Sequence, residues 1–253
     1  MQPHERVSAA IHTADGTALV PFITAGYPDP NAFVSTLIAL AEHAAVIEVG
    51  VPFSDPMADG MTIQRSSHAA IASGVTLTWI LDALAQLREF DTPIVLMSYL
   101  NPMLAFGLDS LAVRAAEVGV CGFIVPDLPF EESSPVREAL ERSGLGLIQL
   151  VTPATPVERL ASLAEASRGF VYAVTVTGIT GGGAGLPQQI GDYLAAVSGA
   201  SDLPVCAGFG IRSAADVARI GEHVDGAIVG SALVEVLEQG ADPSQFLAAL
   251  LDA

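Results

Sequence analysis

Residues 18–50, ALVPFITAGYPDPNAFVSTLIALAEHAAVIEVG, contain two short apolar runs separated by a longer amphipathic segment. The runs at 18–24 and 45–50 are almost continuously apolar, which is typical of strands buried on both faces of a parallel sheet. Residues 31–43 between them have the periodicity of a helix with one apolar face. The stretch therefore predicts a strand, a crossover helix and a second, parallel strand.

The same alternation continues along the chain. Further strands are expected at 93–97, 122–126, 146–151, 170–175, 204–207 and 226–229. Further helices are expected at 77–88, 110–117, 135–142, 156–166, 186–197 and 214–222, with another starting near residue 62. Eight strand–helix units predict a closed parallel barrel or a large doubly wound sheet. The 253 residues give about 32 per unit, near the ~250-residue norm of such barrels, and no linker divides the chain. We expect one α/β domain over residues 1–253, a (β/α)8 TIM barrel.

The charged residues exclude several classes of protein. The 28 acidic and 10 basic side chains give a net charge of −18, which argues against binding nucleic acid or an anionic membrane surface. All ten basic residues are Arg. Schiff-base aldolases, enzymes that carry pyridoxal phosphate and Walker-type nucleotide hydrolases each need a lysine amine, so the sequence excludes all three.

Cysteine, histidine and targeting patterns point to a cytoplasmic protein without a metal. Cys121 and Cys206 lie in apolar runs and are expected to be small buried strand residues in a reducing compartment. The five histidines are scattered without HxH or HExxH spacing, which makes a His/Cys metal site unexpected. We expect no signal peptide and no segment near the ~20 apolar residues that span a bilayer.

Two acidic residues lie where a barrel places its chemistry. Active sites of these barrels form on the loops after the strands, and long loops follow strands at 51–61, 98–107 and 177–187. Glu48 lies near the end of the second strand, where apolar surroundings would raise its pKa and suit it to acid/base catalysis; the alternative is a Glu paired with an Arg. Asp55 and Asp59 in the following loop are turn formers, helix caps or catalytic groups.

Glycine clusters at 177–185, 207–212 and 229–233 follow the late strands. Barrels commonly bind phosphate through loops after strands 7 and 8, so Gly210, Gly230 and Ser231 are candidates for backbone contacts to a phosphate. Tyr172 within the sixth strand and Tyr99 after the third are either core filler or ligand contacts. The glycine-rich run at 178–185 is either a lid over the site or a plain connection.

Taken together, these segments resemble the α subunit of tryptophan synthase. The matching segments are PFITAGYPDP, IEVGVPFSDPMADGMTIQ, LMSYLNP, GFIVPDLPFEE, FVYAVTVTGITG, AGFGI and DGAIVGSALV. They occur in the family's order from Pro21 to about Val234, and the segment from Glu48 to Gln64 is close to diagnostic. The resemblance implies a barrel that cleaves indole-3-glycerol phosphate into indole and glyceraldehyde 3-phosphate without Schiff base or metal.

The resemblance also implies roles for individual residues. Glu48 occupies the position of the acid/base that protonates carbon 3 of the indole, and Asp59 that of the acceptor for the indole N–H. The remaining matches are Phe22 in the indole pocket, Tyr99 and Tyr172 as substrate contacts, Thr180 on the lid, Gly181 in the phosphate cradle, and Gly210, Gly230 and Ser231 as further phosphate contacts.

Family members pair with a β subunit, which carries the pyridoxal phosphate, in an α2β2 assembly through which indole passes. The resemblance places Pro52 and Asp55 in the loop that communicates with this partner. Met61 stands where the family usually has Pro, and the lid continues as GGGAG rather than with polar residues. Because extra glycines raise the entropy lost on lid closure, we expect weak activity without the partner.

Three alternatives remain open on the sequence alone. Two of them are other enzymes on the same scaffold, a phosphosugar isomerase or a stand-alone indole-3-glycerol phosphate lyase. The third is a non-catalytic paralogue that regulates a β subunit. Retention of Glu48 and Asp59 favours cleavage over both isomerisation and a purely regulatory role.

Overall fold

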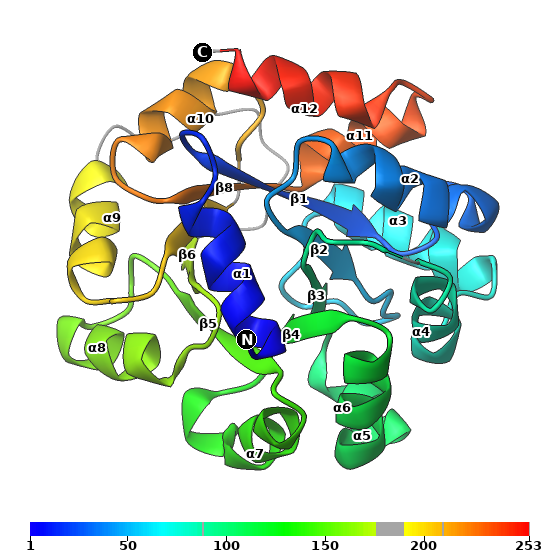
Figure 1. Cartoon of the computed structure of the whole chain (residues 1–253), viewed down its shortest axis with the longest axis horizontal. Coiled ribbons are helices and arrows are strands. Elements are labelled where there is room, and N and C mark those ends of the chain that lie inside the picture. The colour runs from blue at the N-terminus through cyan, green and yellow to red at the C-terminus, as the bar shows by residue number, and fades with distance from the viewer. Residues whose placement is uncertain (88, 176–189, 209, 253) are drawn as a thin grey trace.

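Eight parallel strands close into a barrel in the order of the chain, which confirms the predicted fold class (Figure 1). The computed structural model describes residues 1–87, 89–175, 190–208 and 210–252. The strands are β1 (Ala18–Thr24), β2 (Ile47–Gly50), β3 (Ile94–Met97), β4 (Val120–Ile124), β5 (Gly146–Val151), β6 (Val171–Val174), β7 (Val205–Gly208) and β8 (Gly226–Val229). Pairing of β1 with β8 completes the ring.

Helices surround this ring on its outside (Figure 1). The α-helices are α1 (Pro3–His12), α2 (Phe33–Ala41), α3 (Met61–Ala72), α4 (Leu77–Leu84), α5 (Leu100–Phe106), α6 (Leu108–Glu117), α7 (Ser134–Arg142), α8 (Val157–Ala166), α9 (Ile190–Gly199), α10 (Ala214–Gly221), α11 (Ser231–Glu238) and α12 (Pro243–Leu251). Short 3-10 turns, η1 (Pro30–Ala32) and η2 (Phe130–Glu132), precede α2 and α7.

The boundaries differ from the sequence expectation in a few places. The fourth strand runs over Val120–Ile124 rather than 122–126, because the segment after Ile124 turns away from the sheet. The predicted helix at 77–88 ends at Leu84. The segment at 98–107, expected to be a loop, contains α5, which ends where Gly107 adopts a positive φ of 91°. The first part of the helix expected at 186–197 lies outside the described residues.

The strands contribute to two apolar layers because successive side chains point to opposite faces. One layer, which includes Val20, Val95 and Ile148, fills the barrel interior. The other packs the outer face of the sheet against the helices. Cys121 and Cys206 are unpaired and fully buried in the interior layer, as expected.

Helix α1 closes one end of the barrel (Figure 1). Its Val7 and Ile11 pack against the interior layer, and His4 hydrogen-bonds the carbonyl oxygen of Gly144, just before β5. This is the amino-terminal end of the strands, so the opposite, carboxyl-terminal end remains available for a site. Within the described part of the chain, none of the helices has the length and apolar character that crossing a membrane requires.

Candidate active site

Glu48, the second of the four residues of β2, points into the barrel. Its neighbours Ile47 and Val49 belong to the outer layer and Val46 to the interior, so the alternation of the strand directs Glu48 inwards. The side chain is fully buried, and neither carboxylate oxygen has a hydrogen-bond partner among the described residues. The alternative of a Glu neutralised by an Arg is therefore absent from the described structure.

Burial is the main reason why the pKa of Glu48 is higher than that of an ordinary glutamate. Loss of hydration, together with the nearby negative charge of Asp59, raises the pKa of the Glu48 carboxyl to about 8. The group is then largely protonated at neutral pH, so it can donate a proton and afterwards accept one.

Asp59 is held near the barrel mouth by Tyr99, in the segment between β2 and α3. The Tyr99 hydroxyl accepts a hydrogen bond from the Ala58 N–H at 2.9 Å and also hydrogen-bonds Asp59, while its ring stacks on Phe53 with centroids 5.0 Å apart. Burial raises the pKa of Asp59, and the Tyr99 hydrogen bond partly offsets that rise. Tyr99 therefore positions the acidic loop, and the substrate contact expected of it from the sequence stays a prediction.

Two further residues support this arrangement and escaped the sequence analysis. Gln64 of α3 donates a hydrogen bond from Nε2 to the carbonyl oxygen of Asp59 at 2.8 Å. Asp127, after β4, accepts a hydrogen bond from the Leu100 N–H at 2.9 Å, which fixes the start of α5 next to Tyr99. Gln64 had no sequence signal beyond its place in the matched segment, and Asp127 had only its place after a strand.

Two glycines make room for the aromatic side chains of the site. A Cβ atom on Gly50 would lie 2.5 Å from the Phe22 ring, and a Cβ atom on Gly208 would lie 2.5 Å from the Tyr172 hydroxyl. Phe22 is directly paired with Glu48 in the β1–β2 register. Burial raises the pKa of Tyr172 well above 10, and the charge of Glu48 adds to that rise, which places both groups in one region of the barrel interior.

The candidate phosphate contacts that the structure describes lie at the same end of the barrel. Gly230 follows β8 and precedes α11, which starts at Ser231, so the first N–H groups of this helix are available to an anion. A Cβ atom on Gly230 would lie 3.7 Å from Phe22, which puts this helix end beside the aromatic pocket. Gly210 is exposed and has a φ of 88°. Thr180 and Gly181 lie outside the described residues.

Pro52 and Asp55 lie in the same β2–α3 segment as Asp59. Pro52 is buried, whereas Asp55 is exposed and accepts a hydrogen bond from Ser54 at 2.5 Å. Met57 and Met61 in this segment are 79% and 65% exposed. The segment therefore joins the site to a partly apolar surface.

A model of the tryptophan synthase alpha chain family matches residues 9–251 of the sequence. The chain belongs to this family. The alpha chain of Solidesulfovibrio magneticus is 45% identical over 233 residues, which cover 91% of each protein. That of Desulfovibrio desulfuricans is 44% identical and covers 96% of this chain and 97% of its own.

Solved structures agree with this assignment. A tryptophan synthase structure from M. tuberculosis superposes with a TM-score of 0.87 at 37% identity, covering 98% of this chain and 96% of the other. The alpha chain of Legionella pneumophila gives a TM-score of 0.86 at 35% identity, covering 99% and 95%. As a member of this family, the protein is a lyase that cleaves indole-3-glycerol phosphate in tryptophan biosynthesis, and the family works with a beta subunit.

Replacing Gly208 by Ala should lower the alpha-chain activity roughly 10–100-fold, because the new methyl group displaces the Tyr172 ring and small misplacements in a site are costly. The check is the rate of indole release, together with a melting curve that shows the variant is folded. Gly199→Ala is the matched control, since nothing lies within 4 Å of its added Cβ atom. Wild-type activity of Gly208→Ala would contradict this account of Tyr172.

Replacing Met61 by Pro, the usual residue of the family, should raise the melting temperature by roughly 1–4 °C. Met61 is the first residue of α3, where Pro fits, and the preceding Gly60 has an extended backbone with φ −74° and ψ 167°. Fixing φ in the unfolded chain stabilises the fold by about 0.4–1 kcal/mol, and each 1 kcal/mol raises the melting temperature by about 2–4 °C. Met61→Ala controls for loss of the side chain. If Met61→Pro lowered the melting temperature and Met61→Ala did not, the proline would strain the backbone and the prediction would be wrong.

Proposed function

We propose that the barrel mouth cleaves indole-3-glycerol phosphate by acid/base retro-aldol chemistry with Glu48 as the acid/base and Asp59 as the electrostatic partner. The observation that carries this proposal is the fully buried carboxyl of Glu48, which has no hydrogen-bond partner among the described residues and a pKa raised to about 8. Such a group has little structural use, because an unpaired buried carboxyl is destabilising.

The proton transfers follow from the two carboxyl environments. Protonated Glu48 donates its proton to carbon 3 of the indole, which leaves the ring as a cationic indolenine with its N–H hydrogen-bonded to the Asp59 carboxylate. The bond between carbon 3 and the glycerol chain then breaks, and its electron pair returns to the ring to give indole. The glycerol hydroxyl gives its proton to Glu48 and becomes the aldehyde of glyceraldehyde 3-phosphate, so Glu48 ends protonated as it began.

The rest of the site would orient the substrate. Phe22 and Tyr172 would flank the indole, and Tyr99 would hold Asp59 toward it. Gly230, Ser231 and Gly210 would bind the phosphate through backbone N–H groups, with Gly181 completing the cradle and Thr180 on a lid. This chemistry uses proton transfers alone, and we propose that the chain itself carries no cofactor and acts as a single barrel domain.

We further propose that the chain works in the cytoplasm as the α partner of an α2β2 assembly, whose β subunits hold pyridoxal phosphate and receive indole. The exposed Met57 and Met61 beside Asp55 support a partner surface on the β2–α3 segment. Coupling between the two sites is typically worth about 1–3 kcal/mol, or roughly 5–150-fold in affinity.

The experiment that tests this proposal measures indole release from indole-3-glycerol phosphate by the purified chain, with and without a tryptophan synthase beta subunit. We expect slow cleavage by the chain alone and a steep rise when the beta subunit is added. Fast cleavage at the same rate with and without the beta subunit would indicate a stand-alone lyase. No cleavage under either condition would overturn the assignment of Glu48 and indicate a regulatory paralogue.

A further inference from the structure

Two acidic residues on one face of α11 bind the neighbouring helix α3. Glu235 and Glu238 lie three residues apart on α11, and their partners Thr62 and Arg65 lie three residues apart on α3. Arg65 contacts both carboxylate oxygens of Glu238, from Nη2 at 2.7 and 2.8 Å and from Nε to Oε1 at 2.9 Å. The Thr62 hydroxyl donates to Glu235 Oε1 at 3.3 Å. The two helices are therefore joined at two successive points.

Two loops at the barrel mouth bind the same acids. The Tyr27 hydroxyl, after β1, donates a hydrogen bond to Glu238 Oε1 at 2.7 Å, and Arg212, after β7, forms an ion pair with Glu235. Burial raises the pKa of Glu238, but the hydrogen bonds from Tyr27 and Arg65 outweigh it and hold the pKa below its usual range, so Glu238 is a carboxylate at neutral pH. We call these six residues the α3–α11 network: Tyr27, Thr62, Arg65, Arg212, Glu235 and Glu238.

The network lies at the outer edge of an apolar cluster that reaches the site. Ile63 of α3 and Val234 of α11 are buried with Phe22, the candidate residue of the indole pocket. Arg65 is 55% exposed and Glu238 22%, and an exposed ion pair contributes little to stability. A guanidinium that contacts both oxygens of a carboxylate does fix geometry. The network is therefore better suited to fixing the relative position of the two helices than to stabilising the fold.

Each of the two helices carries one part of the candidate site. Helix α11 begins at Ser231, where its first N–H groups are the candidate phosphate contacts, and both acids of the network lie within about two turns of that end. Helix α3 begins two residues after Asp59, and its Gln64, next to Arg65, donates to the Asp59 carbonyl oxygen at 2.8 Å. The network therefore connects the phosphate end of the site to the carboxylate expected at the indole.

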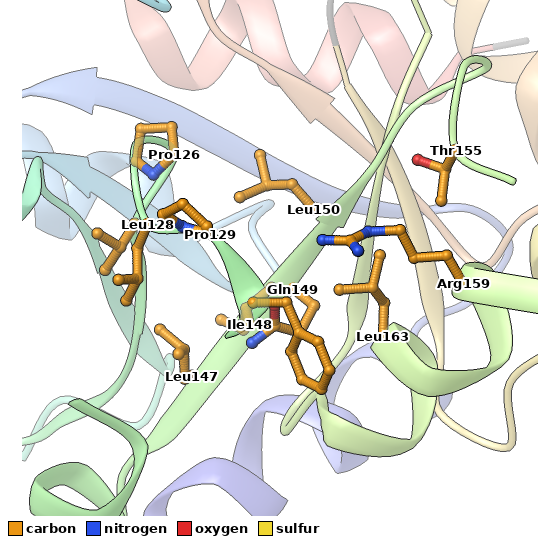
Figure 2. Close-up of a pocket in the computed structure, with 12 residues that line it drawn as sticks. Pro126, Leu128, Pro129, Leu147, Ile148, Gln149, Leu150, Thr155, Arg159 and Leu163 are labelled. Carbon is orange, nitrogen blue, oxygen red and sulfur yellow. The ribbon is translucent and has the colours of Figure 1, made fainter. Parts of the chain in front are cut away.

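A comparable pair of Arg and Glu lies elsewhere on the barrel. Arg159 of α8 borders the pocket shown in Figure 2 and pairs with Glu131, with Nη2 and Oε2 2.9 Å apart. This pair joins α8 to η2, and neither element carries a residue assigned to the site. The elements that are joined, rather than the geometry of the ion pair, distinguish the α3–α11 network.

We propose that Arg65 and Glu238 are positioning residues of the lyase reaction, which fix α11 to α3 so that binding of the substrate phosphate orients the Asp59 carboxylate toward the indole. This rests on the roles of Asp59 and of the start of α11 proposed above. Enzymes use the binding energy of a non-reacting part of the substrate to orient groups at the reacting centre, and an error of about 1 Å there costs up to ~100-fold in rate.

The test compares cleavage of indole-3-glycerol phosphate with cleavage of indole-3-glycerol, which lacks the phosphate, by the chain together with a beta subunit. In Arg65→Gln, kcat for the phosphorylated substrate should fall roughly 10-fold, because α11 no longer holds α3 in place. For indole-3-glycerol, kcat/KM should change by less than about two-fold, because this substrate has no phosphate to bind at α11. Arg114→Gln, which breaks the pair between Arg114 of α6 and Asp82, is the matched control and should leave both reactions unchanged.

Charge reversal separates positioning from damage to the fold. Arg65→Glu alone places like charges together and should lower kcat for the phosphorylated substrate at least as much as Arg65→Gln. Combining it with Glu238→Arg restores an ion pair of opposite direction and should recover most of that kcat. Melting curves of all variants should stay close to that of the wild type, because the pair is exposed.

Three outcomes would overturn the proposal: an equal loss with both substrates, no loss with either, and no recovery in the charge-reversed double variant. If the wild type itself cleaved both substrates equally well, the phosphate contacts proposed above would be wrong and the positioning role would fail with them. If the wild type preferred the phosphorylated substrate and Arg65→Gln kept the full preference, only the positioning role would fail.

Discussion

Replacing Glu48 by Gln is expected to lower kcat for indole release about 10²–10⁴-fold, with KM changed much less. General acid/base catalysis contributes rate factors of this size, and Gln cannot donate or accept the proton that carbon 3 requires. The amide has almost the same shape as the carboxyl group, so the buried site beside Phe22 should remain intact. The measurement is steady-state cleavage of indole-3-glycerol phosphate by the chain together with a beta subunit.

The pH dependence of the wild-type chain gives an independent readout of the same group. With a pKa of about 8 in the free protein, Glu48 is protonated and able to donate at neutral pH, so kcat/KM should fall as the pH rises through about 8. Residual activity of Glu48→Gln should lack this decrease.

Stability should depend on pH in the same window. The unfolded chain loses the Glu48 proton near pH 4.5, whereas the native chain keeps it until about pH 8, so the free energy of unfolding falls as the pH rises between these values. This decrease in the free energy of unfolding amounts to several kcal/mol at most, and it should be absent in Glu48→Gln. The difference between the urea-unfolding curves of wild type and variant at several pH values isolates this contribution from that of other acids.

Glu138→Gln, on an exposed part of α7, is the matched control and should behave like the wild type. Activity of Glu48→Gln within a few-fold of the wild type would refute the role of Glu48 as acid/base. An unchanged pH dependence of stability would show that Glu48 is hydrated or paired in solution.

Replacing Asp59 by Asn should lower kcat about 10²–10³-fold, the usual cost of losing one electrostatic contact to a transition state. Asn still offers an oxygen to the indole N–H but carries no negative charge to stabilise the cationic intermediate. The Tyr99 hydroxyl can still donate to the amide oxygen, so the loop should keep its place. The check is kcat and KM for indole release, measured separately so that loss of transition-state stabilisation is distinguished from loss of binding.

Asp15→Asn, at an exposed position before β1, is the control for removal of one acidic charge. A change in KM alone, with kcat preserved, would assign Asp59 to substrate binding and contradict its proposed electrostatic role. The same substitution should also lower the pKa of Glu48, because the charge of Asp59 contributes to its rise, and should shift the decrease in kcat/KM to lower pH.

The sequence alone determined the fold class and the family. Eight apolar runs with helical segments between them specify a parallel sheet, because strands buried on both faces need helices to cover them, and the length of 253 residues favours a closed barrel. The place of Glu48 near the end of a strand and of Asp59 in the next loop also followed from the sequence, since strand ends meet at one end of a barrel. These features depend on the local pattern of apolar and polar residues, which can be followed directly along the chain.

Only the tertiary structure decided what surrounds these carboxyls. The hydrogen bond from Leu100 to Asp127 joins residues 27 positions apart in the chain, which belong to different strand–helix units. The same is true of Gly208, whose missing side chain makes room for Tyr172 of the neighbouring strand. Such contacts depend on how strands pair and stagger around the ring, and no local sequence pattern encodes that geometry.

The protonation of Glu48 shows the division most clearly. The sequence shows an acid in an apolar strand, which permits either an ion pair with an Arg or an isolated carboxyl. Closure of the barrel turns Glu48 inwards, away from the described arginines that form ion pairs with exposed carboxylates, and removes it from water. The fold thus sets the pKa, because desolvation and distance between charges are properties of three-dimensional packing.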